Sequence, residues 1–327
     1  LTLAEHTGSE LIIRLFTEAE ADLPLFAPRS FRLELPGSFA YLLFGPRGRQ
    51  LYLLETSGRL LTVELDRMGV PTLLLEQNLL PADRTVTAAD VLVGGYSLLL
   101  ADSSAQITQW FATSTNGQLE PIRQFELDSP ATQLIPEPRR KGFAAIDELS
   151  HMHLLHTTSE RMLADHRLAH GNIAITAMSP RADLLLRATE PGTIHSYRLD
   201  NEHPEISLRS LFAATWYEGY EAPIFSWQSS SADNDFEPKF SLTPLLFGTL
   251  TAAFYAMLFA VPLAIMGALY TAYSMSPAMR SVIKPSIEIM AALPTVILGF
   301  LAGIWLAPLI ESNLAGVLAI TVVLPLS

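Results

Sequence analysis

The chain divides into a long polar part and a shorter apolar part. No Asp, Glu, Lys or Arg occurs between Phe240 and Met279, and a second uncharged run extends from Ile289 to Ile310. A third apolar stretch begins near Leu314. Each complete run exceeds the roughly 20 residues that a helix needs to cross the hydrocarbon core of a bilayer. The pattern therefore predicts two complete membrane spans and the start of a third.

In the polar part, pairs of alternating strands joined by small or acidic turns recur along the chain. Such pairs are predicted at 51–65, 97–111, 142–156 and 183–199. Each unit also has an earlier and a later strand candidate, the earlier ones at 40–44, 90–93, 132–135 and 173–177 and the later ones at 72–76, 119–126, 162–166 and 205–211. Four short strands that recur about every 40 to 45 residues are typical of a β-propeller blade.

The repeat predicts an all-β, propeller-like domain. Ile107 to Trp110 and Ile194 to Tyr197 have WD40-like endings, although no complete Gly-His or Trp-Asp pair accompanies them. A β-sandwich with similar turns remains an alternative. The strand-like segment at 10–16 resembles the tail of an earlier unit, so further blades are expected upstream.

These patterns predict three parts of the chain. We expect a partial, propeller-like domain at 1–214, a linker at 215–243 and a transmembrane region at 244–327. The linker is rich in aromatic residues before it becomes acidic. Its rings would suit either an interfacial belt at a membrane or packing beneath the propeller, and both interpretations stay open. Because the chain begins at Leu1 without Met and stops inside an apolar run, we expect sequence beyond both ends.

Charge separates the two parts as clearly as hydropathy does. The net charge is −12, and only Arg280, Lys284, Glu288 and Glu311 are charged after Lys239. The acidic polar part argues against nucleic acid or anionic lipid as its partner. The chain has no cysteine, which excludes disulfides and thiolate metal sites.

The few basic residues of the apolar part predict its orientation. Arg280 and Lys284 lie in the predicted short loop between two spans, and basic residues in such loops are retained on the cytoplasmic side. The segment at 229–237 is acidic and lies one crossing earlier. The polar part is therefore predicted to lie outside the cytoplasm.

Candidate chemistry in the polar part is sparse. His151, His153 and His156, with His166 and His170 nearby, are the candidate metal ligands, and the first two alternate onto one face of a strand. No carboxylate has the expected spacing, so we predict solvated histidines and no metal or cofactor site. No phosphate-binding Walker loop, GxSxG elbow or HExxH helix occurs. We expect no catalytic residue and no enzyme activity.

The apolar part resembles a known family. The matching features are Phe247-Gly248-Thr249, the Ala-Val-Pro-Leu turn at Ala260–Leu263, and Glu288 followed by Ala291-Ala292 and Pro294-Thr295. They resemble the second and third spans of the PstC-type permease of bacterial phosphate ABC importers, in the long form with a large domain inserted between its first two spans. The likeness covers roughly the last 85 residues of the chain.

The resemblance implies a multi-pass subunit of the bacterial inner membrane, with its large N-terminal region in the periplasm. It implies membrane lipid, a second permease subunit, cytoplasmic ATPase subunits and a periplasmic phosphate-binding protein as partners. ATP would be hydrolysed by the separate ATPase subunits. The ATPase-docking helix of the family would lie beyond this chain.

Several residues of the spans are candidates for transport or for packing. Pro262, Pro294 and Pro308 are expected to interrupt helices, which a bilayer tolerates where neighbours satisfy the freed carbonyls. Two small-residue pairs would allow close helix packing, Gly267 with Thr271 and Gly299 with Gly303.

Glu288, Pro294 and Thr295 are the candidates for the substrate path. Thr243 is expected to cap the first span ahead of Pro244, and Pro285 is expected to begin the second. Glu288 would then lie in a first helical turn, where the helix dipole favours a carboxylate, or would pair with a cation on another helix.

Two other functions remain open. A membrane-tethered propeller could act as a protein-binding or assembly module, with the spans serving only as anchors. A periplasmic quinoprotein-like enzyme would need a basic and acidic cofactor cluster in the propeller channel, and the sequence reveals none.

Overall fold

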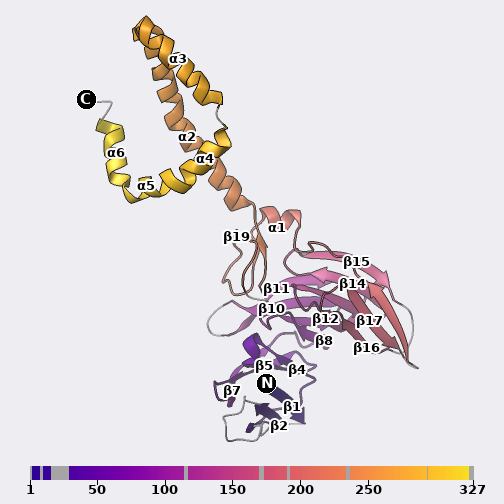
Figure 1. Ribbon diagram of the computed structural model, residues 1–327. Coiled ribbons are helices and arrows are strands. Elements are labelled where there is room, and N and C mark those ends of the chain that lie inside the picture. Colours follow the sequence, from indigo (N-terminus) through magenta and orange to yellow (C-terminus); the bar gives the residue numbers. More distant parts are fainter. Residues whose placement is uncertain are drawn as a thin grey trace, which may run out of the picture. The chain divides into compact units, whose positions relative to one another are not determined.

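The computed structural model describes residues 2–7, 10–15, 29–113, 117–168, 173–189, 192–232, 236–292 and 294–323. The chain divides into two compact units, Leu1–Thr249 and Leu250–Ser327. Strands make up most of the first unit, and helices make up the second (Figure 1). Each unit is described by itself.

The first unit consists of antiparallel meanders, in which strands that follow one another in sequence pair in space. Sheet A contains β1 (Thr2–Thr7), β2 (Glu10–Leu15) and β3 (Arg29–Glu34). Sheet B contains β4 (Tyr41–Phe44), β5 (Gln50–Leu54), β6 (Arg59–Leu65) and β7 (Pro71–Asn78). A short turn of 3-10 helix, η1 (Pro46–Gly48), joins β4 to β5.

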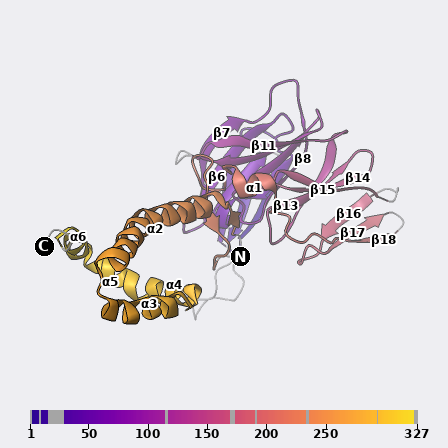
Figure 2. The same cartoon turned by 90° about the horizontal axis from the view of Figure 1, so that it is seen from above.

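Three further meanders follow in the same manner. Sheet C contains β8 (Val86–Val91), β9 (Leu98–Asp102), β10 (Gln106–Ala112) and β11 (Leu119–Glu126). Sheet D contains β12 (Ala131–Pro136), β13 (Gly142–Asp147), β14 (His151–His156) and β15 (Arg161–Arg167). Sheet E contains β16 (Ile173–Met178), β17 (Leu184–Thr189) and β18 (Thr193–Arg198). Figure 2 shows these sheets succeeding one another from β6 and β7 to β16–β18.

Consecutive sheets are stacked, and a separate hydrophobic layer fills each gap between them. Phe39 and Leu61 belong to the layer of sheets A and B, and Leu60 and Leu98 to that of sheets B and C. Phe125 and Phe143 join sheets C and D with ring centroids 5.6 Å apart. Contacts also link β4 to β8, β8 to β12 and β12 to β16, the first strands of successive sheets. This stacking of meanders is propeller-like and confirms the predicted fold class.

The strand pattern was predicted well except at the end of sheet E. The four central strand pairs lie where the repeat placed them. The predicted strand at 205–211 is wrong, because the chain forms the helix α1 (Leu208–Phe212) there. Ser207 caps this helix: its side chain accepts a hydrogen bond from the Ser210 backbone N–H, and the Ser210 hydroxyl accepts one from the Ser207 backbone N–H. Such a capping box favours a helix over a strand.

The segment expected as a linker is folded onto the β unit. The strands β19 (Trp227–Gln228) and β20 (Lys239–Phe240) pair with each other, and Thr215 forms a bridge with Ile224. Tyr217 is only 1% exposed. Trp216 packs edge-on against Phe111 of β10 at 6.4 Å. Tyr217 and Trp216 therefore agree with the interpretation that the aromatic rings pack against the propeller. Phe225 and Trp227 are about half exposed and do not.

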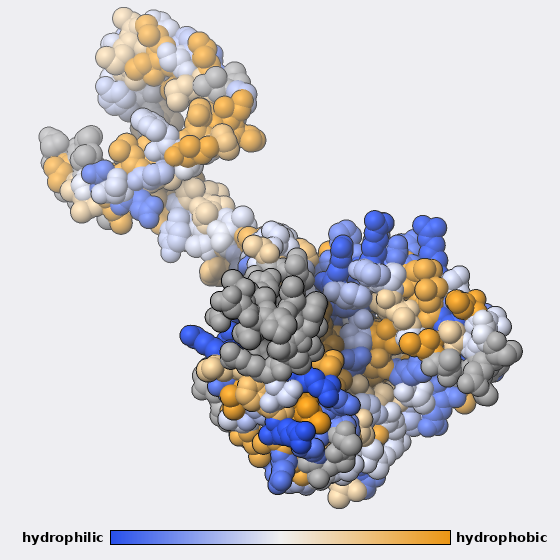
Figure 3. Space-filling model, turned by 60° about the horizontal axis from the view of Figure 1, so that its bottom comes forward, coloured by the Kyte–Doolittle hydropathy of each residue, from blue (hydrophilic) through white to orange (hydrophobic). Residues whose placement is uncertain are grey.

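Among the described residues, two helical stretches are long and apolar enough to cross a membrane, Thr243–Ser274 and Thr295–Ser312. Most of the first and all of the second belong to the helical unit. The first combines α2 (Thr243–Leu269) with the π-helix η2 (Tyr270–Ser274). The second combines α4 (Thr295–Leu301), the π-helix η3 (Ala302–Leu306) and α5 (Ala307–Ser312). Large apolar side chains are exposed along both, and Figure 3 shows hydrophobic side chains gathered on this unit. The helices α3 (Pro277–Ala292) and α6 (Leu314–Val323) complete the unit.

Several expectations for the helices require correction. Thr243 is the first helical residue and does not cap α2, and its hydroxyl donates to the Phe212 carbonyl at 3.3 Å. Pro262 lies inside α2, which continues through it. Pro308 is the second residue of α5 and lies just beyond the wide π turns of η3, so the helix continues past it.

The predicted start of the second span is also wrong. The helix α3 begins at Pro277, passes through Pro285 and ends before Pro294, so the candidate span starts at Thr295. Arg280 and Lys284 therefore lie on a helix rather than in a loop. The Arg280 guanidinium donates to the Ala272 carbonyl at 2.7 Å and so satisfies an acceptor at the end of η2.

The folded segment predicts where the β unit can be cut. A chain shortened to end at Leu242 should be soluble and all-β by circular dichroism. A chain ending at Gln228 loses β20 and Glu237, which accepts hydrogen bonds from Thr158 and from the Glu218 backbone N–H. We expect it to be less stable in urea by about 2 kcal/mol or more, because buried donors lose their partner. Equal stability of the two chains would restore the linker interpretation.

Candidate functional site

Glu288, the charged candidate of the substrate path, lies on α3. Because this helix begins at Pro277, Glu288 is about three turns from its N-terminus and gains no support from the helix dipole. The first-turn interpretation is therefore wrong. Arg280, Lys284 and Glu288 follow one another at four-residue intervals on one face of α3. Glu288 is exposed, and no ion pair to it occurs within 4.0 Å among the described residues.

Pro294 and Thr295 mark the break between α3 and the second candidate span. Pro294 is the N-cap of α4 with an extended backbone, φ −62° and ψ 108°, and Thr295 is the first residue of that helix. The Pro294 carbonyl accepts hydrogen bonds from the backbone N–H groups of Ile297 and Leu298. The break follows from Pro294 itself, since a proline disfavours helical geometry in the preceding residue. The transport roles of Glu288, Pro294 and Thr295 stay predictions.

The small residues proposed for helix packing face open space. A Cβ atom built on Gly267, Gly299 or Gly303 would meet no other atom within 4 Å among the described residues. Thr271 donates its hydroxyl hydrogen bond to the Gly267 carbonyl of its own helix at 2.7 Å. These faces are accessible to another helix, and their packing stays a prediction.

The helical unit also contains a hollow of about 670 Å³ between α2, η2 and α3. Gly267 and Thr271 line one wall, and Arg280, Lys284 and Ile287 line the other. Both basic residues of the apolar part therefore border this space.

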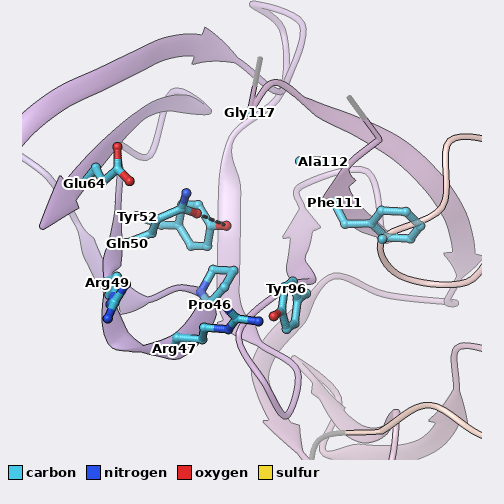
Figure 4. A pocket seen from close by; sticks show the side chains of 11 residues that line it. Pro46, Arg47, Arg49, Gln50, Tyr52, Glu64, Tyr96, Phe111, Ala112 and Gly117 are labelled. Carbon is cyan, nitrogen blue, oxygen red and sulfur yellow. Dashed lines mark hydrogen bonds between the residues drawn. The ribbon is translucent and has the colours of Figure 1, made fainter. Parts of the chain in front are cut away.

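A second hollow, of about 540 Å³, lies in the β unit beside η1 (Figure 4). Arg47, Arg49, Tyr52, Tyr96 and Glu64 are among the side chains that line it. The Arg47 side chain extends toward Tyr96, and Arg47 has a left-handed backbone with φ 55°. Burial, together with the nearby charge of Glu218, raises the pKa of Tyr52 to about 12, so its phenol stays neutral. Exposed guanidinium groups and neutral phenols suit an anionic ligand.

A buried polar network joins the folded segment to the sheets, and no sequence pattern indicated it. Lys141 of the β12–β13 turn forms an ion pair with Glu218 at 2.6 Å and donates to the Val93 carbonyl at 2.7 Å. Ser97 donates to the other Glu218 oxygen at 2.5 Å. Burial raises the pKa of Glu218, and the charge of Lys141 opposes this shift. Partners so far apart in sequence leave no local signal.

The histidines divide into different environments. His151 and His153 lie on β14 near Asp147, a carboxylate that the sequence spacing did not indicate. The prediction of solvated histidines is wrong for His153, which is 2% exposed. His166 is exposed on β15, and His170 lies outside the described residues. His156 is 2% exposed, and burial, followed by the charges of Arg140 and Arg123, lowers its pKa to about 3. His156 is therefore neutral in the folded protein at neutral pH.

Comparison with known proteins gives one likeness in the curated sequences that bears on function. No family model matches the chain. The chain is similar to the probable ABC transporter permease protein YqgH of Bacillus subtilis, with 29% identity over 99 residues, which are 28% of this chain and 32% of that protein. Over that segment the chain resembles an ABC transporter permease. It spans about a third of the length of this relative, and the likeness specifies no substrate.

Solved structures resemble the chain over a larger part of its length. The β-propeller domain of Cps50 (Swd1) from Myceliophteria thermophila matches 59% of this chain and 66% of its own, with a TM-score of 0.45 and 15% identity. A chain of the Mitotic Checkpoint Complex matches with a TM-score of 0.44 and 15% identity over 61% of this chain and 59% of its own.

The neutral state of His156 predicts a pH dependence of stability. Its folded pKa of about 3 lies below the ordinary value of 6.5, so its contribution is fully present above pH 6.5 and is lost as the pH falls toward 3. The slope it adds is at most about 1.4 kcal/mol per pH unit. Urea unfolding followed by tryptophan fluorescence should show a smaller acid dependence for His156→Gln than for the parent. The control His195→Gln should retain the parental slope, and an unchanged slope in His156→Gln would contradict the assignment.

Proposed function

We propose that this chain is a permease subunit of an ATP-driven importer in a bacterial cytoplasmic membrane, and that phosphate is its substrate. The observation that carries the proposal is the similarity to an ABC transporter permease over 99 residues. Two helices in the described part of the chain are long and apolar enough to cross a membrane, which supports it. The chain would form part of a translocation path and would leave ATP hydrolysis to a separate subunit.

The choice of phosphate rests on the resemblance to PstC-type permeases. Phe247-Gly248-Thr249, Ala260–Leu263 and Glu288 with Pro294-Thr295 carry that resemblance. The family pattern adds a second permease subunit, cytoplasmic ATPase subunits and a periplasmic phosphate-binding protein as partners. In that pattern the β unit would lie in the periplasm.

The described residues set limits on how such a path could be built. Lys and Arg are absent from both candidate spans, so phosphate would need cations or donors from another source. Arg280 and Lys284 lie on α3, between the two spans, and border the hollow next to Gly267 and Thr271. Glu288 shares their face of the helix. A carboxylate repels phosphate, so Glu288 would act by pairing with a cation of a partner helix.

A second function is favoured by the hollow of the β unit. Arg47 and Arg49 line it together with Tyr52 and Tyr96, and neither arginine forms an ion pair within 4.0 Å among the described residues. A tethered propeller that binds an anionic group of a partner would use this site. Such a module predicts that Arg47→Gln abolishes partner binding and leaves transport unchanged.

Uptake measurements test the transport function directly. In a strain without other phosphate uptake systems, deletion of the gene should lower uptake of radiolabelled phosphate at limiting concentration by about tenfold or more. Sulfate uptake should change less than about twofold. If sulfate uptake alone were lost, sulfate rather than phosphate would be the substrate. If neither phosphate uptake nor sulfate uptake changed, the proposed transport function would be wrong.

The same assay tests the pairing of Glu288. Breaking a buried charge pair costs about 3 to 5 kcal/mol, whereas exposed pairs contribute about 1 kcal/mol or less. We therefore expect Glu288→Gln to lower phosphate uptake strongly at matched membrane levels, and the control Glu311→Gln to change it little. Uptake within about twofold of the parent would remove Glu288 from the path.

Labelling of single cysteines tests the orientation. The chain has no native cysteine, so a new one is the only thiol. Ser104 is exposed in the β9–β10 turn and Ser281 is exposed on α3. In intact cells made permeable only at the outer membrane, a membrane-impermeant maleimide should label Ser104→Cys and spare Ser281→Cys. The reverse pattern would place the β unit in the cytoplasm.

A further inference from the structure

One side-chain cluster in sheet D is unlike the rest of the β unit. Asp147 ends β13, and His151 and His153 lie two residues apart on the facing strand β14. One donor atom from each of the three side chains lies within 4.8 Å of the others. His153 Nε2 and the Asp147 carboxylate are 3.5 Å apart. The β hairpin thus brings a carboxylate and two imidazoles together without any loop rearrangement.

His153 is buried without a hydrogen-bond partner. Its side chain is 2% exposed, and neither ring nitrogen has a hydrogen-bond partner among the described residues. A buried polar group without a partner costs about 1–3 kcal/mol, so native proteins rarely retain one. The Nε2 atom is directed toward Asp147, and the Nδ1 atom lies 3.7 Å from an Asp165 carboxylate oxygen. Both distances exceed that of a hydrogen bond.

The carboxylate of Asp147 is fixed in place by its neighbours. One oxygen accepts a hydrogen bond from the Ser129 hydroxyl at 2.7 Å, and the other accepts one from the His151 backbone N–H at 2.7 Å. These two hydrogen bonds hold the carboxylate in one orientation at the end of β13. A carboxylate held in place beside two imidazoles is a donor set that binds divalent transition metals.

Sheet C provides an internal comparison, because it has the same turn without the histidines. Asp102 ends β9 and accepts a hydrogen bond from the Gln106 backbone N–H four residues later, as Asp147 does from His151. There the charge of Asp102 is matched by Arg84 at 3.1 Å. No Lys or Arg pairs with Asp147 within 4.0 Å among the described residues. The turn therefore does not require histidines. In sheet C an arginine accompanies the aspartate, whereas in sheet D two histidines, both potential metal ligands, accompany it.

We propose that Asp147, His151 and His153 bind a divalent transition-metal ion, and that Zn²⁺ fits the donor set. Zinc binds imidazole nitrogen and carboxylate oxygen at about 2.0–2.2 Å. Ligands at that distance from a tetrahedral ion lie about 3.4 Å apart, close to the His153–Asp147 separation. Nε2 of His153 is then a ligand, and its Nδ1–H donates to Asp165, the outer partner that metal-bound histidines typically have. Water takes the fourth position, and the ion clamps β13 to β14.

Metal binding by the full-length chain in detergent tests this site. The protein is prepared without a histidine tag, stripped with a chelator and titrated with Zn²⁺ against a chromophoric competitor. We expect one equivalent to bind, and Co²⁺ to give the intense visible bands of a tetrahedral complex. Asp165→Asn should weaken Zn²⁺ binding by about tenfold or more through loss of the outer partner.

Substitutions that copy the equivalent residues of sheet C are expected to fold, because sheet C forms the same turn with those residues. His151→Gln and His153→Thr introduce the residues that β10 has at the same places, Gln106 and Thr108, and both should lose Zn²⁺ binding. His166→Gln, an exposed histidine on the neighbouring strand β15, is the matched control and should bind like the parent. Failure of the parent to bind at micromolar Zn²⁺ overturns the proposal, and so does equal binding by His151→Gln. Binding of Cu²⁺ or Ni²⁺ with Zn²⁺ excluded would overturn the choice of metal.

Discussion

The β unit depends on burial of both faces of its middle strands. The inner strands β5, β9 and β13 are buried almost throughout, because each sheet is packed between two neighbours. Apolar burial contributes roughly 25 cal/mol per Å² and has no preferred direction, so the four hydrophobic layers hold the stack together without specific bonds. Some charged residues lie where strands end. Asp102 and Asp147, which end the second strands of their sheets, are examples.

Several polar groups of the interior are paired, and these pairs join segments that the hydrophobic layers do not hold. Lys141 and Glu218 form such a pair, and Glu237 and Thr158 form another contact between the folded segment and sheet D. Removing one member of a buried ion pair strands the other charge in a medium that solvates it poorly. These contacts explain why residues 215–241 are part of the β unit. Other interior polar atoms lack a partner among the described residues, including Trp110 Nε1, Arg187 Nη1 and both ring nitrogens of His153. A metal ion would supply a partner for His153.

The helical unit follows a different constraint. In hydrocarbon every backbone donor and acceptor has to be satisfied within the segment, and helices achieve this locally. The chain departs from a regular helix at η2, at η3 and at Pro294, and each departure has a local cause in the sequence or a compensating contact. Arg280 compensates the first by donating to the Ala272 carbonyl. The exposed apolar surface of α2 and α4 requires either lipid or other helices around it.

The sequence by itself determined the elements whose causes are local. Alternation of apolar residues predicted the positions of the central strand pairs, and the absence of charge predicted the position of α2. Both signals are local, because a strand takes a few residues and a membrane span takes about twenty. Local rules also misled: the apolar residues before Phe212 predicted a strand, whereas the Ser207–Ser210 capping box formed α1. The helix α3 also continues through Pro285, which was predicted to be its first residue. Tolerance of that proline depends on its surroundings.

Only the tertiary structure decided which distant residues meet. His151 and His153 were visible as a pair on one strand, but their proximity to Asp147 depends on the β13–β14 register, and the Ser129 contact depends on the turn before β12. Glu218 and Lys141 are far apart in sequence and leave no periodic signal, so neither the ion pair nor the packing of the folded segment could be predicted. Side-chain alternation fixes the face on which a residue lies. Its partner is chosen by pairing and stacking of whole sheets, which involves many residues at once.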